Sequence, residues 1–385
     1  MLGDPGLGAV FEGGGKGGVT EVEGRHAFAK ALNIEGVDGE GSVAAGGAAF
    51  TADEPGAGAA GGVGESGVHN LDELSVASGE RHVARLRPWT TCNRGHTGRG
   101  RDEACVIYLE HTPAPPLNRF VRMLWYAQAP QPAHKRERVL PTGRTQVILN
   151  LARDFILDCP EEPVAVGPMV RVAPSLVIGS RSVYEVVDTS DMADLIGMVF
   201  EPGAFPVFAG DAADLFSNRS VDLEDIWGAA ARSLRDRLRE IPTPAGKLVC
   251  LESDLAARLN AQFARRAVKL HGAVDFALTC FGRAPGVATV AEVAKSTGWS
   301  ERRFSQVFRE QVGLSPKIWC RVQRFQMAVQ RLHAGRDVRW SELALDCGFY
   351  DQAHFANEFR AFSGIDPTTY SAARGTPWAN HVRVD

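Results

Sequence analysis

The sequence lacks several features that would assign it to a membrane, secretory or disulfide-rich class. No apolar run approaches the ~18–20 residues that a membrane-spanning helix requires, so we expect no membrane partner. Residues 1–19 show no basic segment followed by an apolar core, which argues against a secretory signal. The seven cysteines include no CxxC pair, so neither a zinc site nor a disulfide framework is expected. Reduced thiols in a cytoplasmic protein are the simplest interpretation.

Catalytic signatures are also missing. The glycine-rich GGGKGG at residues 13–18 has neither the spacing of a phosphate-binding loop nor a strand before it. His111 and His134 are isolated, whereas a metal-dependent cupin enzyme needs an HxH pair with further Glu and His ligands. No Ser/His/Asp set is evident. We therefore expect a protein that is not an enzyme, with no catalytic residue, no metal and no cofactor.

Glycine and charge are unevenly distributed along the chain. Residues 1–100 hold 24 of the 41 glycines and few aromatic residues, so this segment cannot bury enough apolar surface to offset its ordering entropy. We predict a Gly-rich disordered extension over 1–100, whose function as a linker stays open. In residues 271–385, Lys and Arg outnumber Asp and Glu by 14 to 11, against 8 to 13 in residues 1–100. This basic end favours a polyanionic partner only if its cations share one face.

The middle of the chain has the residue composition and spacing of a β-sheet. Short runs rich in β-branched and aromatic residues, separated by Pro and Gly, indicate an antiparallel sheet or small barrel over about 105–210. Two apolar stripes at helical spacing follow and predict helices that close this domain, with a dimer face as a further role. We place a β-rich domain at residues 101–265. The residues of the stripes are Leu223, Ile226, Trp227, Ala230, Leu234 and Leu238, then Leu248, Leu251, Leu255 and Leu259.

Five polar or aromatic residues of the middle region are candidates for lining a ligand pocket. The alternative is that they belong to the core or to the surface, and the sequence does not decide between the two. These residues are Trp125, Tyr126, Arg144, Asn150 and Tyr184.

The last part of the chain contains an internal repeat. Residues 289–316 form the first copy and residues 341–367 the second. When Phe304 is aligned with Phe355, three further pairs coincide: Phe308 with Phe359, Gly313 with Gly364, and Pro316 with Pro367. The motif Ala-x-x-x-Gly precedes each aligned phenylalanine, with a slip of one residue in the turn.

Each copy has the local signals of a helix, a turn and a second helix. Thr289 and Glu292 can form a capping box at the first helix. Gly298 and Gly348 stand where the chain must turn sharply, which favours a positive φ. Trp299 and Phe349 can fill the core after these glycines, and Ser300 and Asp351 are suitable N-caps for the second helices.

The second helix of each copy has an apolar and a polar face. Phenylalanines are predicted to point inward, and polar side chains recur on the opposite side. Arginine suits guanine, and glutamine or asparagine suits adenine, at base edges in the major groove, whereas arginines one turn further along are better placed for phosphate. The candidate DNA-binding residues are Arg302, Ser305, Gln306 and Arg309 in the first copy, and Gln352, Ala353, His354, Asn357 and Arg360 in the second.

Between the copies, one apolar stripe predicts a connecting helix of about five turns. Its residues are Ile318, Val322, Phe325, Val329 and Leu332. Such a helix can hold two units at a fixed separation, and second helices about 34 Å apart would meet successive major grooves on one face of DNA.

At these residues the resemblance to a known family is specific. Residues 271–375 resemble the DNA-binding domain of the AraC/XylS regulators, above all through CGFYDQAHFANEFRAFSGIDPTTY. The resemblance implies base contacts at Arg302, Ser305 and Gln306, and at Ala353 and Asn357. Ala353 departs from the pattern, because alanine cannot form a hydrogen bond with a base, so the second unit either discriminates less or contacts a thymine methyl group.

The upstream region also resembles a sensor region found in one subgroup of these regulators, through PPLNRFVRMLWY and RVLPTGRTQVILNL. The implied fold is α+β: an N-terminal β-rich, cupin-like domain with closing helices, then an all-α C-terminal domain of two helix-turn-helix units joined by a linker helix. The expected partner is promoter or operator DNA; RNA polymerase, a small-molecule effector and a homodimer stay open.

The resemblance thus implies a cytoplasmic, sequence-specific transcription factor, with an effector-controlled N-terminal domain. One alternative is a DNA-repair or other enzyme that carries this DNA-binding domain as an accessory. Such an enzyme would need a nucleophilic cysteine in a reactive setting, and the sequence indicates none. A second alternative is an upstream domain that only dimerises and binds no ligand.

Overall fold

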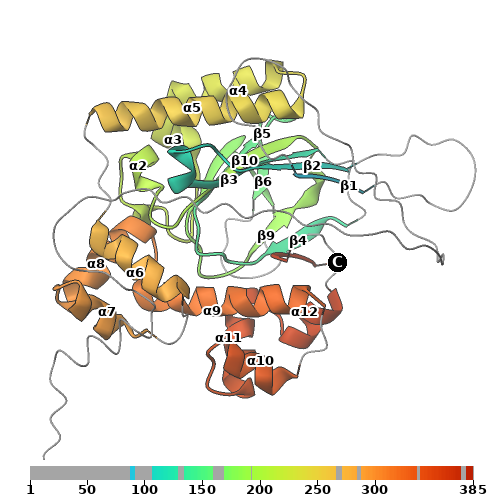
Figure 1. Cartoon of the computed structure of the whole chain (residues 1–385). Helices are drawn as coiled ribbons and strands as arrows, with labels where there is room; N and C mark the ends of the chain where they lie inside the picture. The colour runs from blue at the N-terminus through green and yellow to red at the C-terminus, as the bar shows by residue number, and fades with distance from the viewer. Residues whose placement is uncertain are drawn as a thin grey trace, which may run out of the picture. The chain divides into compact units, whose positions relative to one another are not determined.

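The computed structural model describes residues 87–91, 106–128, 134–158, 169–191, 193–265, 271–283, 288–335, 339–373 and 379–384. Residues 1–86, and with them most of the predicted extension, lie outside this range. The described chain consists of a β-rich region followed by helices (Figure 1).

A large antiparallel sheet forms the first region. Its strand order is β1-β2-β3-β10-β5-β8-β11, with every neighbouring pair antiparallel. The strands are β1 (Arg87–Thr91), β2 (Val106–His111), β3 (Val121–Gln128), β5 (Gln146–Asn150), β8 (Ser175–Ile178), β10 (Leu195–Phe200) and β11 (Ser220–Asp222).

Two smaller sheets accompany it. One has the order β12-β4-β9 and the other pairs β6 with β7. Their strands are β4 (Arg136–Val139), β6 (Ile156–Asp158), β7 (Val170–Val172), β9 (Glu185–Asp188) and β12 (His381–Arg383). Because β12 follows all the helices in sequence, the end of the chain returns to the β-rich region.

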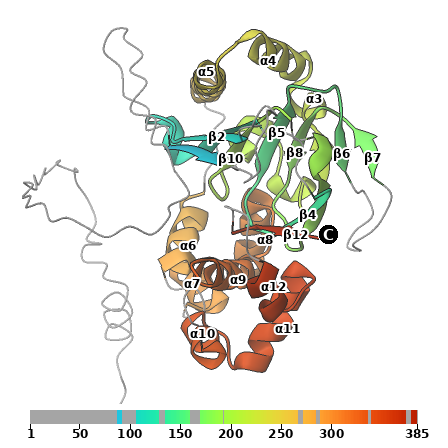
Figure 2. The same cartoon turned by 90° about the vertical axis from the view of Figure 1, so that its right-hand side faces the viewer.

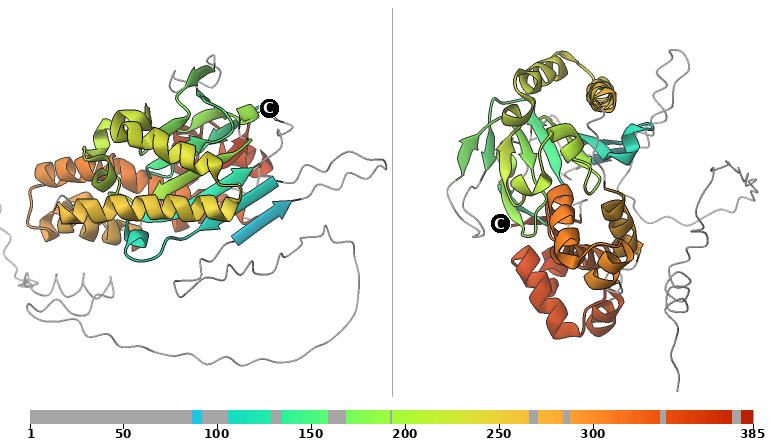
Figure 3. Two further views of the ribbon diagram at one scale, coloured as in Figure 1. Left: turned by 90° about the horizontal axis from the view of Figure 1, so that it is seen from above. Right: turned by 90° about the vertical axis from the view of Figure 1, so that its left-hand side faces the viewer.

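Short helices connect the strands and two longer ones cover the sheet. The short ones are η1 (Leu117–Arg119), η2 (Thr189–Asp191), α2 (Pro206–Ala209), η3 (Ala213–Leu215) and α3 (Leu223–Trp227). The helices α4 (Ala229–Glu240) and α5 (Pro244–Ala264) lie side by side, and α5 runs across β2 and β3 (Figure 3). The predicted stripe Leu248, Leu251, Leu255 and Leu259 is buried against the core of the sheet.

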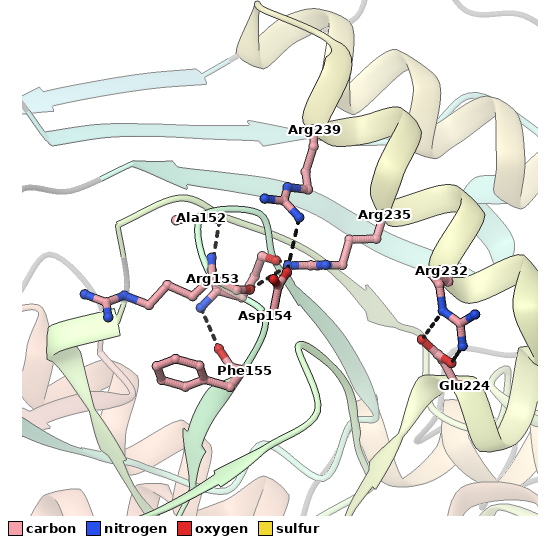
Figure 4. Close-up of polar contacts among 9 residues, drawn as sticks. Ala152, Arg153, Asp154, Phe155, Glu224, Arg232, Arg235 and Arg239 are labelled. Carbon is pink, nitrogen blue, oxygen red and sulfur yellow. Dashed lines mark hydrogen bonds and ion pairs between the residues drawn. The ribbon is translucent and has the colours of Figure 1, made fainter.

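A buried arginine fixes α4 to the sheet. The guanidinium of Arg235 donates to the Asn150 carbonyl at 2.7 Å, to the Arg153 carbonyl at 2.6 Å and to Asp154 Oδ1 at 2.8 Å (Figure 4). The side chain of Asn150 closes the same turn, since its Oδ1 accepts from the backbone N–H groups of Ala152 and Arg153. These contacts satisfy a charge that would otherwise be costly to bury.

Two expectations about this region were wrong in detail. Residues 87–91 form β1 and pair with β2, although the sequence predicted a mostly disordered segment over 1–100 and did not single out this strand. The stripe that begins at Leu223 is divided between α3 and α4, because Gly228 adopts φ 58° and ψ −148° and ends α3. Behind this break the buried alanine is Ala231, and Ala230 is exposed.

The remaining helices form one body (Figure 2). They are α6 (Gly272–Arg283), α7 (Val290–Ser296), α8 (Glu301–Val312), α9 (Pro316–His333), α10 (Trp340–Asp346), α11 (Gln352–Ser363) and α12 (Pro367–Ala373). Among the described residues, no helix has the length and apolar character needed to cross a membrane.

Candidate nucleic-acid interface

The first helix-turn-helix unit consists of α7 and α8. Thr289 and Glu292 form the predicted capping box at the start of α7. Gly298 turns the chain with φ 74°, and the Ser300 hydroxyl accepts from the Arg303 N–H at the start of α8. The inner face of the unit is fully buried and includes Val293, Ala294, Phe304, Phe308 and Val312. The capping, the turn and the inward phenylalanines are therefore as predicted, whereas Trp299 is only half-buried and does not fill the core.

The second unit, α10 and α11, repeats this construction with a richer aromatic core. Gly348 has φ 76°, and Asp351 caps α11 by accepting from the His354 N–H at 2.7 Å. Phe355 packs against Phe349 at 5.2 Å and against Phe359 at 5.7 Å between ring centroids. All three rings are buried, as the repeat predicted for the aligned phenylalanines.

The connecting helix α9 has 18 residues, so it spans about 27 Å. It packs on the first unit through Trp319, which lies 6.3 Å from Phe308, and on the second through Phe325, which lies 5.0 Å from Phe359. Of the predicted stripe, Ile318 is only half-buried and Trp319 takes its place in the core. Both units therefore share one apolar core along α9.

The candidate DNA-binding side chains of the first unit lie on the outer face of α8. Arg302, Gln306 and Arg309 are exposed, and Ser305 is half-buried. The Gln306 side chain is held in place because its Nε2 donates a hydrogen bond of 2.9 Å to Oε1 of Glu310, one helical turn further along. Their spacing brings these side chains onto one side of the helix, as the alignment predicted.

The second unit presents its candidates in the same way on α11. Gln352, Ala353, Asn357 and Arg360 are exposed. His354 is half-buried, and its Nδ1 accepts from the Tyr350 backbone N–H at 3.2 Å. Because one ring nitrogen is engaged in the turn, only the other is free to act as a donor toward a ligand.

One candidate has a partner that the sequence did not reveal. Arg309 donates from Nε at 3.1 Å and from Nη2 at 3.0 Å to Asp214 Oδ2 in η3 of the β-rich region. A second contact lies beside it, because the Ser180 hydroxyl donates to the Val312 carbonyl at 2.7 Å. The end of α8 is thus attached to the region that precedes it in the chain.

A second arginine of the helical body stabilises the two units internally. Arg321 of α9 donates two hydrogen bonds of 2.7 Å to the carboxylate of Glu358 in α11. Burial raises the pKa of Glu358, but the hydrogen bond and positive charge of Arg321 outweigh burial and lower the pKa below its ordinary value. This pair fixes α11 against the connecting helix and leaves the outer face of α11 for a ligand.

The thiols of the helical body are not activated. Burial raises the pKa of Cys320 to about 12 and that of Cys347 to about 11. Both are therefore protonated at neutral pH and poor nucleophiles. Cys347 is buried, as expected, whereas Cys320 is partly exposed. Cys92, Cys105 and Cys159 lie outside the described residues.

Three of the five pocket candidates of the β-rich region have structural contacts. Asn150 closes the turn described above, and the ring of Tyr184 lies against the position where Gly364 would carry a Cβ. Tyr126 is buried, and burial together with the charge and hydrogen bond of Asp194 raises its pKa. Among the described residues, no group of three His, Cys, Asp or Glu side chains is arranged to hold a metal ion.

Two helix pairs are joined by α9, and the second helix of each pair is capped and has an exposed polar face. This arrangement defines a double helix-turn-helix domain. Residues 293–373 match a family model described as helix-turn-helix domain, and residues 109–222 match one described as domain of unknown function. Residues 293–373 thus form a helix-turn-helix domain.

Part of the chain is similar to a curated protein. A probable transcriptional regulator, LumQ, from Photobacterium leiognathi is 33% identical over 82 residues, which are 21% of this chain and 33% of that protein. The chain therefore matches about a third of that relative's length.

Two solved structures are similar to parts of this chain. A transcriptional regulator with an AraC-type DNA-binding domain from Chromobacterium violaceum shows 22% identity, covering 28% of this chain and 96% of its own, with a TM-score of 0.26. ToxT from Vibrio cholerae O395 shows 9% identity, covering 62% of this chain and 95% of its own, with a TM-score of 0.36.

Proposed function

We propose that the chain is a transcription regulator that binds promoter DNA sequence-specifically with α8 and α11 in successive major grooves. The observation that carries this proposal is that Arg302, Gln306 and Asn357 stand exposed on second helices whose inner faces share one core. Their guanidinium and amide groups match the donor and acceptor patterns of guanine and adenine. Arg360 lies a turn further along α11, where a phosphate contact is expected.

The test is selection from fragmented DNA with the purified full chain, followed by sequencing of the bound fragments. We expect a recurring motif with two half-sites about 10–11 base pairs apart, as two recognition helices on one DNA face require. An Arg302→Ala, Asn357→Ala double variant is the control, since both positions are exposed and the fold should persist. Recovery of bulk DNA without any enriched motif would refute sequence-specific binding.

The β-rich region is proposed to control this binding in response to an effector. The contacts of Arg309 with Asp214 and of Ser180 with Val312 support this step, because they join the β-rich region directly to the end of α8. A ligand could break these contacts and release α8 from η3. It would do so only if it binds the state without the contacts with a different affinity from the state that has them. Thermal-shift screening of the full chain against metabolites, with DNA affinity measured for each hit, tests this step; hits that never alter DNA affinity would contradict it.

This function places the protein in the cytoplasm, where promoter DNA and RNA polymerase are accessible, and assigns it no enzymatic activity. A DNA-repair activity would transfer an alkyl group from DNA to a cysteine thiolate, and the raised pKa values of Cys320 and Cys347 disfavour these two thiols as acceptors. Incubation with alkylated DNA checks this, since methyl transfer to the protein would restore the enzyme hypothesis.

Light scattering of the purified chain would establish whether it is a dimer.

A further inference from the structure

The turn of the second helix-turn-helix unit is one residue longer than that of the first. Between α7 and α8 the turn covers residues 297–300, and between α10 and α11 it covers residues 347–351. The N-caps Ser300 and Asp351 correspond to one another. The aromatic residues that follow the turn glycines also correspond: the half-buried Trp299 and the buried Phe349. The additional residue of the second unit is therefore the one between Phe349 and Asp351, which is Tyr350.

The additional side chain points into solvent. Tyr350 is 85% exposed, the highest fraction among the exposed large hydrophobic residues of the described chain. Its neighbour Phe349 is only 3% exposed and lies under Arg324. The backbone at Tyr350 is fixed, because its N–H donates to His354 Nδ1 at 3.2 Å and Asp351 caps the following helix. The turn thus holds an aromatic ring with a hydroxyl group outward in a defined place, where it is free to contact a ligand.

We propose that Tyr350 contacts the sugar–phosphate backbone of DNA at the start of α11 and anchors the second unit there. This inference rests on the proposed function. In helix-turn-helix domains the recognition helix enters the groove with its N-terminal residues first, so a side chain in the turn before it approaches the rim of the groove. The phenolic hydroxyl donates to phosphate oxygens, which are among the commonest protein contacts with DNA.

The composition of α11 supports a phosphate anchor rather than a base contact. Ala353 occupies a position expected to face the bases and has no polar group, whereas the first unit carries Arg302 there. The second unit therefore offers fewer groups that distinguish bases, and an anchor that ignores sequence would offset the lost contacts. The first unit has no counterpart of Tyr350, so the two units would differ in role. The first unit would discriminate more strongly between base sequences, and the second would contribute more affinity that is independent of sequence.

A protein partner is the competing occupant of this surface. Leu345 of α10 is 62% exposed and lies two residues before Cys347, where the turn begins, so it shares this end of the unit with Tyr350. A surface that binds a protein would use both residues, because the buried centre of a protein–protein interface is formed mainly by apolar contacts. A phosphate anchor would use Tyr350 alone, which gives the test a matched control.

The experiment measures binding of the full chain to a selected operator and to a scrambled duplex at several salt concentrations. We expect Tyr350→Ala to weaken binding to both duplexes about tenfold, the size of one hydrogen bond to a charged group. Tyr350→Phe should lose nearly as much, because the hydroxyl that donates to the phosphate is gone although the ring stays. The salt dependence should not change, since no cation is removed. Leu345→Ala should bind as the native chain does.

The outcomes separate this inference from the proposed function. If the native chain binds the operator but Tyr350→Ala stays within twofold of it on both duplexes, the anchor is refuted and the regulator stands. If the native chain prefers no duplex, the regulator itself fails. If Tyr350→Ala and Leu345→Ala both keep DNA binding but lose association with RNA polymerase, the surface binds a protein and the anchor is refuted. Melting curves of the three variants confirm that each one folds.

Discussion

Arg309 of α8 and Asp214 of η3 form an ion pair with two hydrogen bonds to a single carboxylate oxygen, at 3.1 and 3.0 Å. The arginine side chain remains 62% exposed, whereas the aspartate is 17% exposed. An arginine expected to contact phosphate thus already has an anionic partner within the same chain. Phosphate and Asp214 are competing anions for the same guanidinium.

This competition predicts that Asp214→Asn binds DNA more tightly than the native chain. The gain should be small, about two- to fivefold, because an exposed ion pair contributes at most about 1 kcal/mol. It should shrink as salt rises, since screening weakens the pair that is removed. Fluorescence anisotropy with a labelled operator measures both effects.

Asp211→Asn is the matched control for that experiment. It removes the same charge three residues earlier in the chain, at an exposed position before η3, and within the described part of the chain Asp211 has no ion pair with α8. If both variants gain equally, the effect is one of net charge alone. In that case Asp214 does not compete for Arg309.

A second prediction concerns the division of work along the recognition helices. Arg302→Ala should reduce the preference for operator over scrambled DNA, because a bidentate contact to guanine contributes about 1–3 kcal/mol of discrimination. Arg360→Ala should weaken binding to both duplexes alike and lower the salt slope by about one. Titrations at three salt concentrations measure affinity and slope together. Equal losses on operator and scrambled DNA for both variants would reject this division.

The sequence predicts those parts of the fold that depend on neighbouring residues. The capping box at Thr289, the positive φ of Gly298 and Gly348, and the inward phenylalanines each follow from short-range spacing, and the structure confirms them. The partner of Arg309 lies 95 residues away in sequence, and no local pattern marks Asp214 as that partner.

Other features of the fold could not be predicted from the sequence, for related reasons. The strand β1 lies within the segment that is rich in glycine, so its five residues carry too weak a signal to stand out from their surroundings. The strand β12 depends on pairing with β4, far away in the chain, rather than on its own composition. Only the extra residue at Tyr350 left a trace, as the one-residue slip in the repeat, but the slip alone does not show that the ring faces solvent.

A third prediction concerns the shared core of the helical body. Phe359 is fully buried between Phe325 at 5.0 Å and Tyr370 at 5.5 Å, so Phe359→Ala leaves a cavity on α9. We expect the free energy of unfolding to fall by about 3–5 kcal/mol, as measured by urea denaturation. Phe263→Ala, at a residue that is 43% exposed on α5, should cost far less. Similar losses for both variants would mean that Phe359 is not a central core residue.

A fourth prediction follows from Glu137 in β4, which joins the end of the chain to the β-rich region. Its Oε1 faces His134 Nε2 at 2.5 Å, and its Oε2 faces His381 Nδ1 of β12 at 2.7 Å. Burial raises the pKa of Glu137, but the hydrogen bonds and charges of His381 and His134 outweigh burial, so the pKa lies below its ordinary value. A carboxylate with a lowered folded-state pKa stabilises the fold above the unfolded-state value, and this stabilisation is lost as the pH falls through the folded-state pKa.

The melting temperature of the native chain should therefore fall as the pH drops below about 4.5, and Glu137→Gln should remove part of that fall. The variant should also melt lower at pH 6, because an amide cannot replace a carboxylate between two histidines. Glu240→Gln, at an exposed residue that ends α4, serves as the control and should leave the acid limb unchanged. Parallel curves for the native chain and Glu137→Gln between pH 3 and 6 would show that this carboxylate does not couple the terminal strand to stability.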